Sequence, residues 1–463
     1  MGENDRGLPK SYALFRSQLN LVGPSYDVPC VLLWHVVIGV LMRKIVVELG
    51  RIRTDMRVSA IIAKPPGHGG GAIKNSILRM LKGVVKVSVP TSRHEEQLVG
   101  KVIHIIRGRI ETVEKNLGYL KDPLVIFDEA LPLILGHDDR FDKFWGYVNT
   151  ALDTYGENLI EKRGVNDLEG LAYFAEMTAL FIMQLAKIPN SFISRGPFRR
   201  CVPILIEVSN NEKKEILRRR LTESRPSDSG LKELQEYFRN LASLKGLHCT
   251  YAPGVEDAIE KGTNELLALA KANPSAIVRQ YGGIMHSTFP DLLLKMAVHL
   301  AVDDALFGKT VYDPPSVFPE YEETPPAGTT VGSTPDIEVT VEHTQTALEQ
   351  LRILLMESTF EFLDRLVREP PKIPISGQQE FLALKTLKDW GQLDENSSTK
   401  TVAEFLEELG RILGCSQYNA RRLYIKNRKK GWINSKQVGS YESRIWLTPE
   451  GLRVLESERT VSQ

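Results

Sequence analysis

Short apolar runs alternate with amphipathic patterns along residues 28–310. The apolar runs predict strands at residues 44–48, 58–64, 84–89, 124–127 and 202–208. Apolar residues at helical spacing predict helices at residues 73–81, 95–118 and 141–155. Connections of this length suit parallel strands, so the pattern predicts an α/β fold with a doubly wound sheet. Residues 230–310 predict a helical lid on that sheet, with a strongly apolar helix at residues 291–301.

The longest apolar run extends from Val28 to Met42 and is 15 residues long. A transmembrane helix needs roughly 20 apolar residues. We therefore expect a buried helix and no membrane partner, with a membrane anchor as the alternative. The four cysteines are widely spaced and include no C-x-x-C pair, which favours a reducing compartment over zinc or disulfides. These features predict a cytoplasmic protein.

A composition break follows residue 310. Residues 312–342 carry repeated prolines and little apolar periodicity, so we expect a linker over residues 311–344. Helical patterns then cover residues 346–368, 378–390, 402–413 and 417–430, and strands are expected at residues 432–436 and 444–447. Pro449 begins a last helix that Thr448 caps. Three helices followed by two strands are the layout of a winged helix.

A glycine-rich turn lies between the strand at residues 58–64 and the helix at residues 73–81. Such a turn lets backbone N–H groups close on phosphates, and the helix start adds positive potential. In the usual P-x-G-x-G-K-S/T form, the lysine and the hydroxyl stand where this chain has Gly70 and Gly71. Lys64 and Lys74 are the lysines on either side. The residues expected to bind the phosphates are Pro66, Gly67, His68, Gly69, Gly70, Gly71, Ala72 and Lys74.

The strand at residues 124–127 ends in two carboxylates, Asp128 and Glu129. In phosphoryl-transfer sites one carboxylate holds Mg²⁺ and another group orients the attacking water. We expect Asp128 to bind the metal and Glu129 to be catalytic, with ATP and Mg²⁺ as cofactors. This interpretation requires the glycine turn and the acidic strand end to lie together, on adjacent strands. A coincidental glycine-rich turn is the alternative.

Charge is segregated near the C-terminus. The whole chain carries a net charge of +1, whereas residues 411–444 contain nine basic residues and one acidic residue, Glu442. The second helix of a winged helix can enter the major groove, where basic side chains pair with phosphates. A winged helix that contacts protein is the alternative. The DNA-binding candidates are Gln417, Arg421, Arg422, Lys426, Arg428, Lys429, Lys430 and Lys436.

With these motifs, residues 28–305 resemble the AAA+-like P-loop proteins of phages, plasmids and integrative elements, which are similar to mini-chromosome maintenance helicases. The order of elements carries the resemblance. An apolar helix and a strand precede the glycine turn, and the segment at residues 191–200 precedes the strand at 202–208. The resemblance implies a homo-hexamer that acts on single- and double-stranded DNA.

The resemblance also implies roles for further residues. Arg195 would reach the γ-phosphate bound to a neighbouring subunit, with Arg199 and Arg200 as alternatives, unless it is an ordinary surface arginine that caps a strand. Thr178 would sense the γ-phosphate, unless it is an ordinary helix threonine. Residues 157–164 would form a hairpin in the central channel of the ring and place basic side chains on DNA, unless they form a solvated turn. The candidate DNA contacts in this hairpin are Lys162 and Arg163.

We therefore expect a replicative DNA helicase-like ATPase of a mobile genetic element. A non-hydrolysing initiator or DNA-binding protein with a degenerate phosphate loop is the first alternative, and a signalling NTPase is the second. The expected domains are a lead-in at residues 1–56, an AAA+-like P-loop NTPase core with lid at 57–310, the linker at 311–344, and a helix plus winged helix at 345–463. The resemblance also implies a second sensor residue near the start of the helix at residues 291–301, and the choice between Arg279 and His286 is left open.

Overall fold

The fold is given by a computed structural model of the chain. It describes residues 8–19, 21, 23–65, 68–90, 95–107, 110–134, 139–162, 170–186, 197–222, 227–308, 334–367, 377–413, 417–438 and 442–459. The chain divides into two compact units, Met1–Val367 and Arg368–Gln463. Each unit is described by itself.

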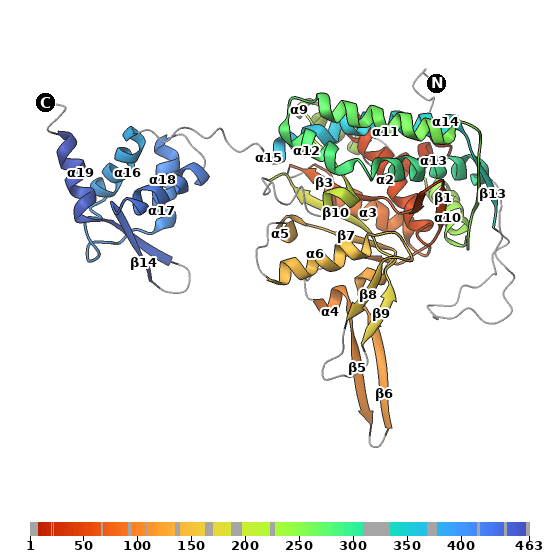
Figure 1. Cartoon of the computed structure of the whole chain (residues 1–463), viewed down its shortest axis with the longest axis horizontal. Helices are drawn as coiled ribbons and strands as arrows, with labels where there is room; N and C mark the ends of the chain where they lie inside the picture. The colour runs from red at the N-terminus through yellow and green to blue at the C-terminus, as the bar shows by residue number, and fades with distance from the viewer. Residues whose placement is uncertain are drawn as a thin grey trace. The chain divides into compact units, whose positions relative to one another are not determined.

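The first unit is an α/β structure built on a five-stranded parallel sheet (Figure 1). The strand order is β11-β3-β10-β7-β4, and every neighbouring pair is parallel. The carboxyl ends of all five strands therefore lie at one edge of the sheet. The strands are β3 (Ser59–Lys64), β4 (Val87–Ser88), β7 (Leu124–Phe127), β10 (Thr178–Gln184) and β11 (Cys201–Leu205).

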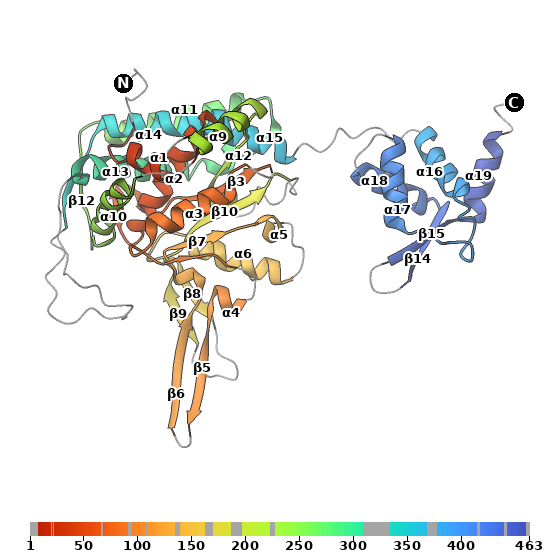
Figure 2. The same ribbon diagram turned by 180° about the vertical axis from the view of Figure 1, so that it is seen from behind.

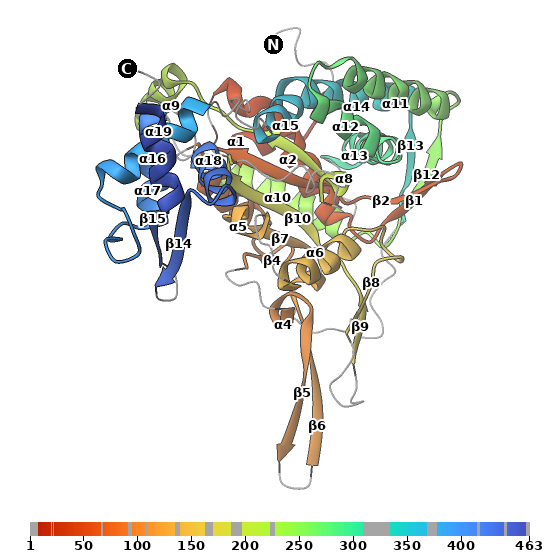
Figure 3. The same cartoon turned by 60° about the vertical axis from the view of Figure 1, so that its left-hand side comes forward.

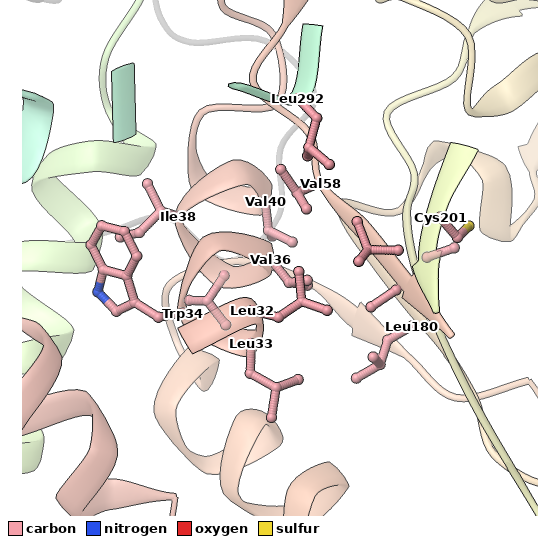
Figure 4. Close-up of a cluster of buried hydrophobic side chains, with 14 of the residues drawn as sticks. Leu32, Leu33, Trp34, Val36, Ile38, Val40, Val58, Leu180, Cys201 and Leu292 are labelled. Atoms are coloured by element: carbon pink, nitrogen blue, oxygen red, sulfur yellow. The ribbon is translucent and has the colours of Figure 1, made fainter. Parts of the chain in front are cut away.

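Helix α2 (Asp27–Leu41) forms the centre of the first unit, as the apolar run predicts. It packs against β3 and β10, and against α13 and α14. Figure 4 shows Leu32 and Val36 on the side of Val58 and Leu180, with Trp34 on the opposite side of the helix. By length and composition the window Pro24–Leu41 could cross a membrane, but 72% of it is buried inside the protein. Burial on all sides explains why α2 is apolar around its whole circumference.

Further helices surround the sheet, and Figure 2 shows them from behind. Residues 230–310 are mostly helical, as expected, with one short strand, β12 (His248–Tyr251). The helices of this unit are α1 (Tyr12–Gln18), α3 (Gly70–Leu81), α4 (Glu95–Leu98), α5 (Leu131–Ile134), α6 (Asp139–Ala151), α8 (Pro197–Arg200), α9 (Asn210–Thr222), α10 (Asp228–Ala242), α11 (Val255–Ala272), α12 (Ala276–Met285), α13 (Phe289–Leu306), α14 (Val341–Leu354) and α15 (Phe360–Val367).

Helices α14 and α15 belong to the first unit, which corrects the expected domain boundary at residue 345. Gln350 of α14 forms a hydrogen bond of 2.8 Å with His35 of α2, and both residues are buried. Strand β13 (Asp336–Val339) pairs in parallel with β12, although residues 311–344 were expected to be a linker. The expected linker therefore ends before this strand, and residues 309–333 lie outside the described part.

Three antiparallel hairpins extend the first unit. One joins β1 (Val46–Leu49) to β2 (Ile52–Asp55), and another joins β8 (Leu159–Lys162) to β9 (Leu171–Phe174). The longest pairs β5 (Gly100–Arg107) with β6 (Ile110–Leu117), and Figure 3 shows it projecting away from the sheet. The prediction of a helix at residues 95–118 is therefore wrong beyond α4. Valine, isoleucine and threonine are frequent here, and β-branched side chains favour strands.

The second unit has its own hydrophobic core, formed by residues such as Leu384, Phe405 and Leu423. Helices occur at the expected positions and are followed by an antiparallel strand pair. The elements are α16 (Gly377–Asp389), α17 (Val402–Leu413), α18 (Gln417–Lys429), β14 (Ile433–Val438), β15 (Glu442–Leu447) and α19 (Pro449–Arg459). Thr448 caps α19 as predicted, since the Gly451 N–H donates to its Oγ1 at 3.1 Å.

Candidate nucleotide and nucleic-acid sites

The glycine turn follows the carboxyl end of β3 and leads into α3. His68 is 4% exposed, and its Nδ1 accepts a hydrogen bond of 3.0 Å from the N–H of Val208, just after β11. This bond anchors the turn to the neighbouring strand. Gly69 precedes α3 with φ +83°, a left-handed conformation that favours glycine, and an added Cβ would lie 2.9 Å from the Tyr26 hydroxyl.

The first turn of α3 presents two glycines where a phosphate loop normally has a lysine and a hydroxyl. The N-cap residue Gly69 has no side chain to bind the first N–H groups of the helix, which have no partners within a helix. A Cβ at Gly71 would meet no atom within 4 Å, so this side of the helix start is open. The turn therefore offers backbone donors and a positive helix end that could receive an anion.

Asp128 and Glu129 lie just beyond the carboxyl end of β7. The Lys74 ammonium, on α3, lies 2.5 Å from Asp128 Oδ2, so the helix after the glycine turn contacts the acidic strand end directly. The chain turns sharply here, because the Ala130 N–H donates to the carbonyl of Ile182 in β10 at 2.8 Å. Glu129 has φ +58°, the one positive value at a non-glycine residue among those described.

The requirement of adjacent strands is not met, because β10 lies between β3 and β7. The requirement that the two segments lie together is met, because Lys74 of α3 contacts Asp128. The two motifs still meet, since all three strands end at the same edge. Insertion of β10 brings a residue that the sequence analysis missed. Gln184 is the last residue of β10, is exposed, and pairs in register with Lys64, the last residue of β3. Its position at the carboxyl edge makes Gln184 a candidate contact for a ligand there.

Thr178 lies at the opposite edge of the sheet, where it pairs in register with Leu124 at the start of β7. Thr178 and Gln184 are six residues apart along β10, about 20 Å at the rise of a strand. The assignment of Thr178 as a sensor at this site is therefore wrong. Its position was misjudged because residues 178–184 include Ala, Leu, Met and Gln, which do not favour a strand over a helix.

The alternative arginines also lie at the amino edge. Arg200 forms an ion pair with Asp153, with Nε 2.7 Å from Oδ1, whereas Arg199 is exposed at the end of α8. Because α8 immediately precedes β11, these arginines are separated from the glycine turn by the length of the sheet. Other proposed site residues lie outside the described residues, namely Pro66, Gly67, Arg163 and Arg195.

The residues at the carboxyl edge fit a magnesium ion that arrives with a nucleotide. Mg²⁺ is commonly held by one or two carboxylates together with substrate phosphates. Asp128 supplies one partly exposed carboxylate, and Lys74 contacts one of its two oxygens. Within the described part of the chain, no group of three or more His, Cys, Asp or Glu side chains gathers to hold a metal. The phosphates would therefore have to complete the coordination.

The predicted DNA-binding residues of the second unit separate into two groups. Glu380 of α16 has a side chain only 5% exposed, and it pairs with Lys426 and with Lys430, whose Nζ lies 2.5 Å from Oε2. Burial would raise the pKa of Glu380, but the two lysines outweigh this effect and hold the pKa below its usual value. Lys436 pairs with Glu395 at 2.6 Å. These three lysines are thus engaged within the unit.

Most of the remaining basic residues of α18 lie on its outer side. Arg421, Arg428 and Lys429 are exposed, and Ile425 on the same face is 42% exposed. Arg422 is half-buried, and Gln417 begins the helix. The spacing of positions 421, 425 and 428 follows one face of a helix. This face is the part of the predicted interface that is available to a partner.

The β8–β9 hairpin gives one further result. The Lys162 ammonium donates to the carbonyl of Gly100 at 3.1 Å, so it joins this hairpin to the start of β5.

No family model matches the chain, and no curated protein matches it.

Proposed function

We propose that the first unit binds a magnesium nucleoside triphosphate at the carboxyl edge of its sheet and couples it to work on DNA, as a helicase-like ATPase. The contact between Lys74 and Asp128 is the observation that supports this proposal most directly. It brings the helix after the glycine turn beside the acidic strand end, an arrangement that a phosphoryl-transfer site would need. Ligands of parallel α/β sheets bind at this same edge.

In this proposal the triphosphate lies against the N–H groups at the start of α3. Asp128 would hold Mg²⁺, which neutralises phosphate charge when bound. Glu129 would accept a proton from the attacking water and orient it, and its fixed turn beyond β7 keeps the carboxylate at the sheet edge. Gln184 would contact the terminal phosphate from the end of β10.

The second unit would serve as a winged helix that contacts DNA through α18. Arg421, Arg428 and Lys429 provide the exposed positive charge for this role. In the hairpin, Lys436 and Arg444 lie directly opposite each other on β14 and β15. Lys436 is already paired with Glu395, so Arg444, which is exposed, is the residue of the two that adds to the positive charge available to DNA. The proposal includes a homo-oligomeric ring, in which Arg199 or Arg200 would act on the nucleotide of a neighbouring copy, since both lie far from the site of their own chain.

A specific observation favours the alternative of a non-hydrolysing DNA-binding protein. Gly70 and Gly71 provide neither the ammonium nor the hydroxyl of the usual phosphate loop. Such a protein would bind a nucleotide without turning it over, and its DNA-binding unit would remain functional.

Phosphate release by the full chain, with and without forked DNA, tests the proposal. We expect turnover that DNA stimulates and that the Glu129→Gln variant reduces by roughly 10²-fold or more, because the general base is lost. The matched control is Glu260→Gln, on the exposed side of α11. Turnover that Glu129→Gln leaves unchanged would refute the assignment of this residue. Nucleotide binding without turnover would establish the alternative.

A further inference from the structure

The side chain of Lys64 occupies the space that a side chain at position 70 would need. A Cβ built on Gly70 would lie 2.0 Å from Lys64 Cε and 2.9 Å from Lys64 Nζ. The lysine comes from the last residue of β3, whose carbonyl accepts a hydrogen bond of 3.0 Å from the Leu185 N–H. The stem therefore starts from a fixed strand end and reaches the first turn of α3.

No carboxylate among the described residues pairs with the Lys64 ammonium. Lys74 differs, because its ammonium is engaged by Asp128. Of the two lysines that flank the glycine turn, Lys64 is thus the one whose charge is available at the helix start. An ammonium beside unpaired N–H groups is a favourable environment for an anion.

We propose that Lys64 supplies, from the strand, the phosphate-binding ammonium that residue 70 lacks in this chain. The inference deepens the proposed function and rests on it, since it assigns a ligand contact within the same nucleotide site. The glycine at position 70 then does more than remove the usual phosphate-binding lysine. A larger residue at position 70 would compete with the Lys64 stem, so the lysine at position 64 and the glycine at position 70 form a matched pair.

The state of His68, in the same turn, supports the assignment of the positive charge to Lys64. Burial lowers the pKa of His68, and Lys213 and Lys64 lower it further against the opposing effect of Glu207. The Val208 N–H donates to Nδ1, so this nitrogen carries no proton, and the lowered pKa favours the same neutral ring. The turn relies on Lys64 rather than on His68 for positive charge.

Equilibrium binding of a fluorescent ATP analogue and of the matching monophosphate to the full chain tests the inference. The Lys64→Met variant keeps most of the apolar stem but removes the charge. We expect it to bind the triphosphate roughly tenfold more weakly, since a hydrogen bond to a charged group is lost. The monophosphate, which lacks the outer phosphates, should lose less. Lys82→Ala, at the far end of α3, is the matched control and should bind as the unaltered protein does.

A second variant tests the exchange of the two positions. Gly70→Lys combined with Lys64→Ala removes the competing stem and places an ammonium on the helix, and we expect it to restore triphosphate affinity to within about threefold. If the unaltered chain binds the triphosphate while Lys64→Met binds it equally well, the inference fails and the nucleotide site stands. If the unaltered chain binds no nucleotide, the proposed function itself fails. Thermal unfolding of each variant distinguishes lost binding from lost folding.

Discussion

At the residue scale, the backbone of Glu129 carries strain at the proposed catalytic position. Its φ of +58° is uncommon for a residue with a side chain, and such conformations persist where the surrounding structure imposes them. Here the bond from Ala130 to Ile182 fixes the turn. The same conformation directs the chain away from the sheet directly after Asp128. Strain retained at this position is consistent with a functional role for the carboxylate.

Replacing Glu129 with glycine should separate strain from chemistry. We expect Glu129→Gly to raise the free energy of unfolding by about 0.5–1 kcal/mol, because glycine adopts positive φ without a steric cost. The variant should also lose turnover. Glu129→Gln, which keeps the strained backbone, should lose turnover with unchanged stability. Urea unfolding of the three proteins measures the difference. A Glu129→Gly variant less stable than the Gln variant would contradict the role assigned to strain.

The two groups of basic residues in α18 should respond differently to substitution. The plot of log affinity against log salt concentration has a negative slope. Arg428→Ala should make this slope less steep by about 0.9 on duplex DNA, because one phosphate contact is lost. Lys426→Ala should change this slope little and instead reduce the stability of the second unit by about 0.5–1.5 kcal/mol, because Glu380 loses one of its two lysine partners. Fluorescence anisotropy over a salt series and thermal unfolding measure the two effects. An unchanged slope in Arg428→Ala would exclude this arginine from the interface.

At the element scale, β10 separates the two strands that end at the candidate nucleotide site. It lies at the centre of the sheet, and its carboxyl end brings Gln184 beside the end of β3. Its amino end is preceded by Glu176, whose side chain is 5% exposed. Three basic residues surround this carboxylate at 2.8–2.9 Å: Arg43, Lys44 and Lys121. The cluster ties the end of α2 and the segment before β7 to the start of the central strand.

The Glu176 cluster should make the first unit sensitive to acid. Burial alone would raise the pKa of Glu176, but Lys121, Arg43 and Lys44 lower it to about 2, from an ordinary value of 4.5. The carboxylate therefore stabilises the fold at pH values above 4.5, and this contribution is lost as the pH falls from 4.5 towards 2. We expect Glu176→Gln to lower the free energy of unfolding by about 2–3 kcal/mol at pH 7. Urea unfolding at pH 7 and at pH 3.5 measures the effect.

The difference between Glu176→Gln and the unaltered protein should shrink at pH 3.5. Glu161→Gln, at an exposed position of strand β8, is the matched control and should show little change at either pH. An equal difference at both pH values would contradict the role of the ionised carboxylate.

The sequence predicts the elements that carry strong local patterns, and it misses those whose form depends on tertiary context. The glycine turn, the apolar strand before Asp128 and the buried helix α2 are visible in the pattern because each has a distinct composition. Strand β10 is not, because all of its residues but the last are buried and several of them also suit a helix. The contact between Lys64 and Gly70 is equally hidden, since it depends on how far one flexible side chain extends across a turn.

At the scale of the whole molecule, each of the two units has its own hydrophobic core. The first unit is held by one large hydrophobic cluster, and the second by a separate cluster that includes Leu384, Phe405 and Leu423. Separate cores allow the proposed nucleotide site and the proposed DNA-binding surface to fold independently. The division also places α14 and α15 in the first unit, where Gln350 of α14 contacts His35 of α2.

The second unit should therefore fold without the first. We expect a fragment of residues 377–463 to unfold in a single cooperative transition, because its core is complete in itself. It should also bind duplex DNA with the same salt dependence as the full chain. Circular dichroism during heating and anisotropy titrations measure both properties. A fragment that folds only when the first unit is added would contradict the independence of the two cores.

The crystal structure of the full chain with Mg²⁺ and a non-hydrolysable ATP analogue tests the central claim most directly. We expect the triphosphate to lie at the carboxyl edge of the sheet, against the N–H groups of Gly70 and Gly71, with Asp128 and Glu129 beside its terminal phosphate. A triphosphate bound elsewhere, or none bound at a concentration that saturates nucleotide-dependent proteins, would contradict the account.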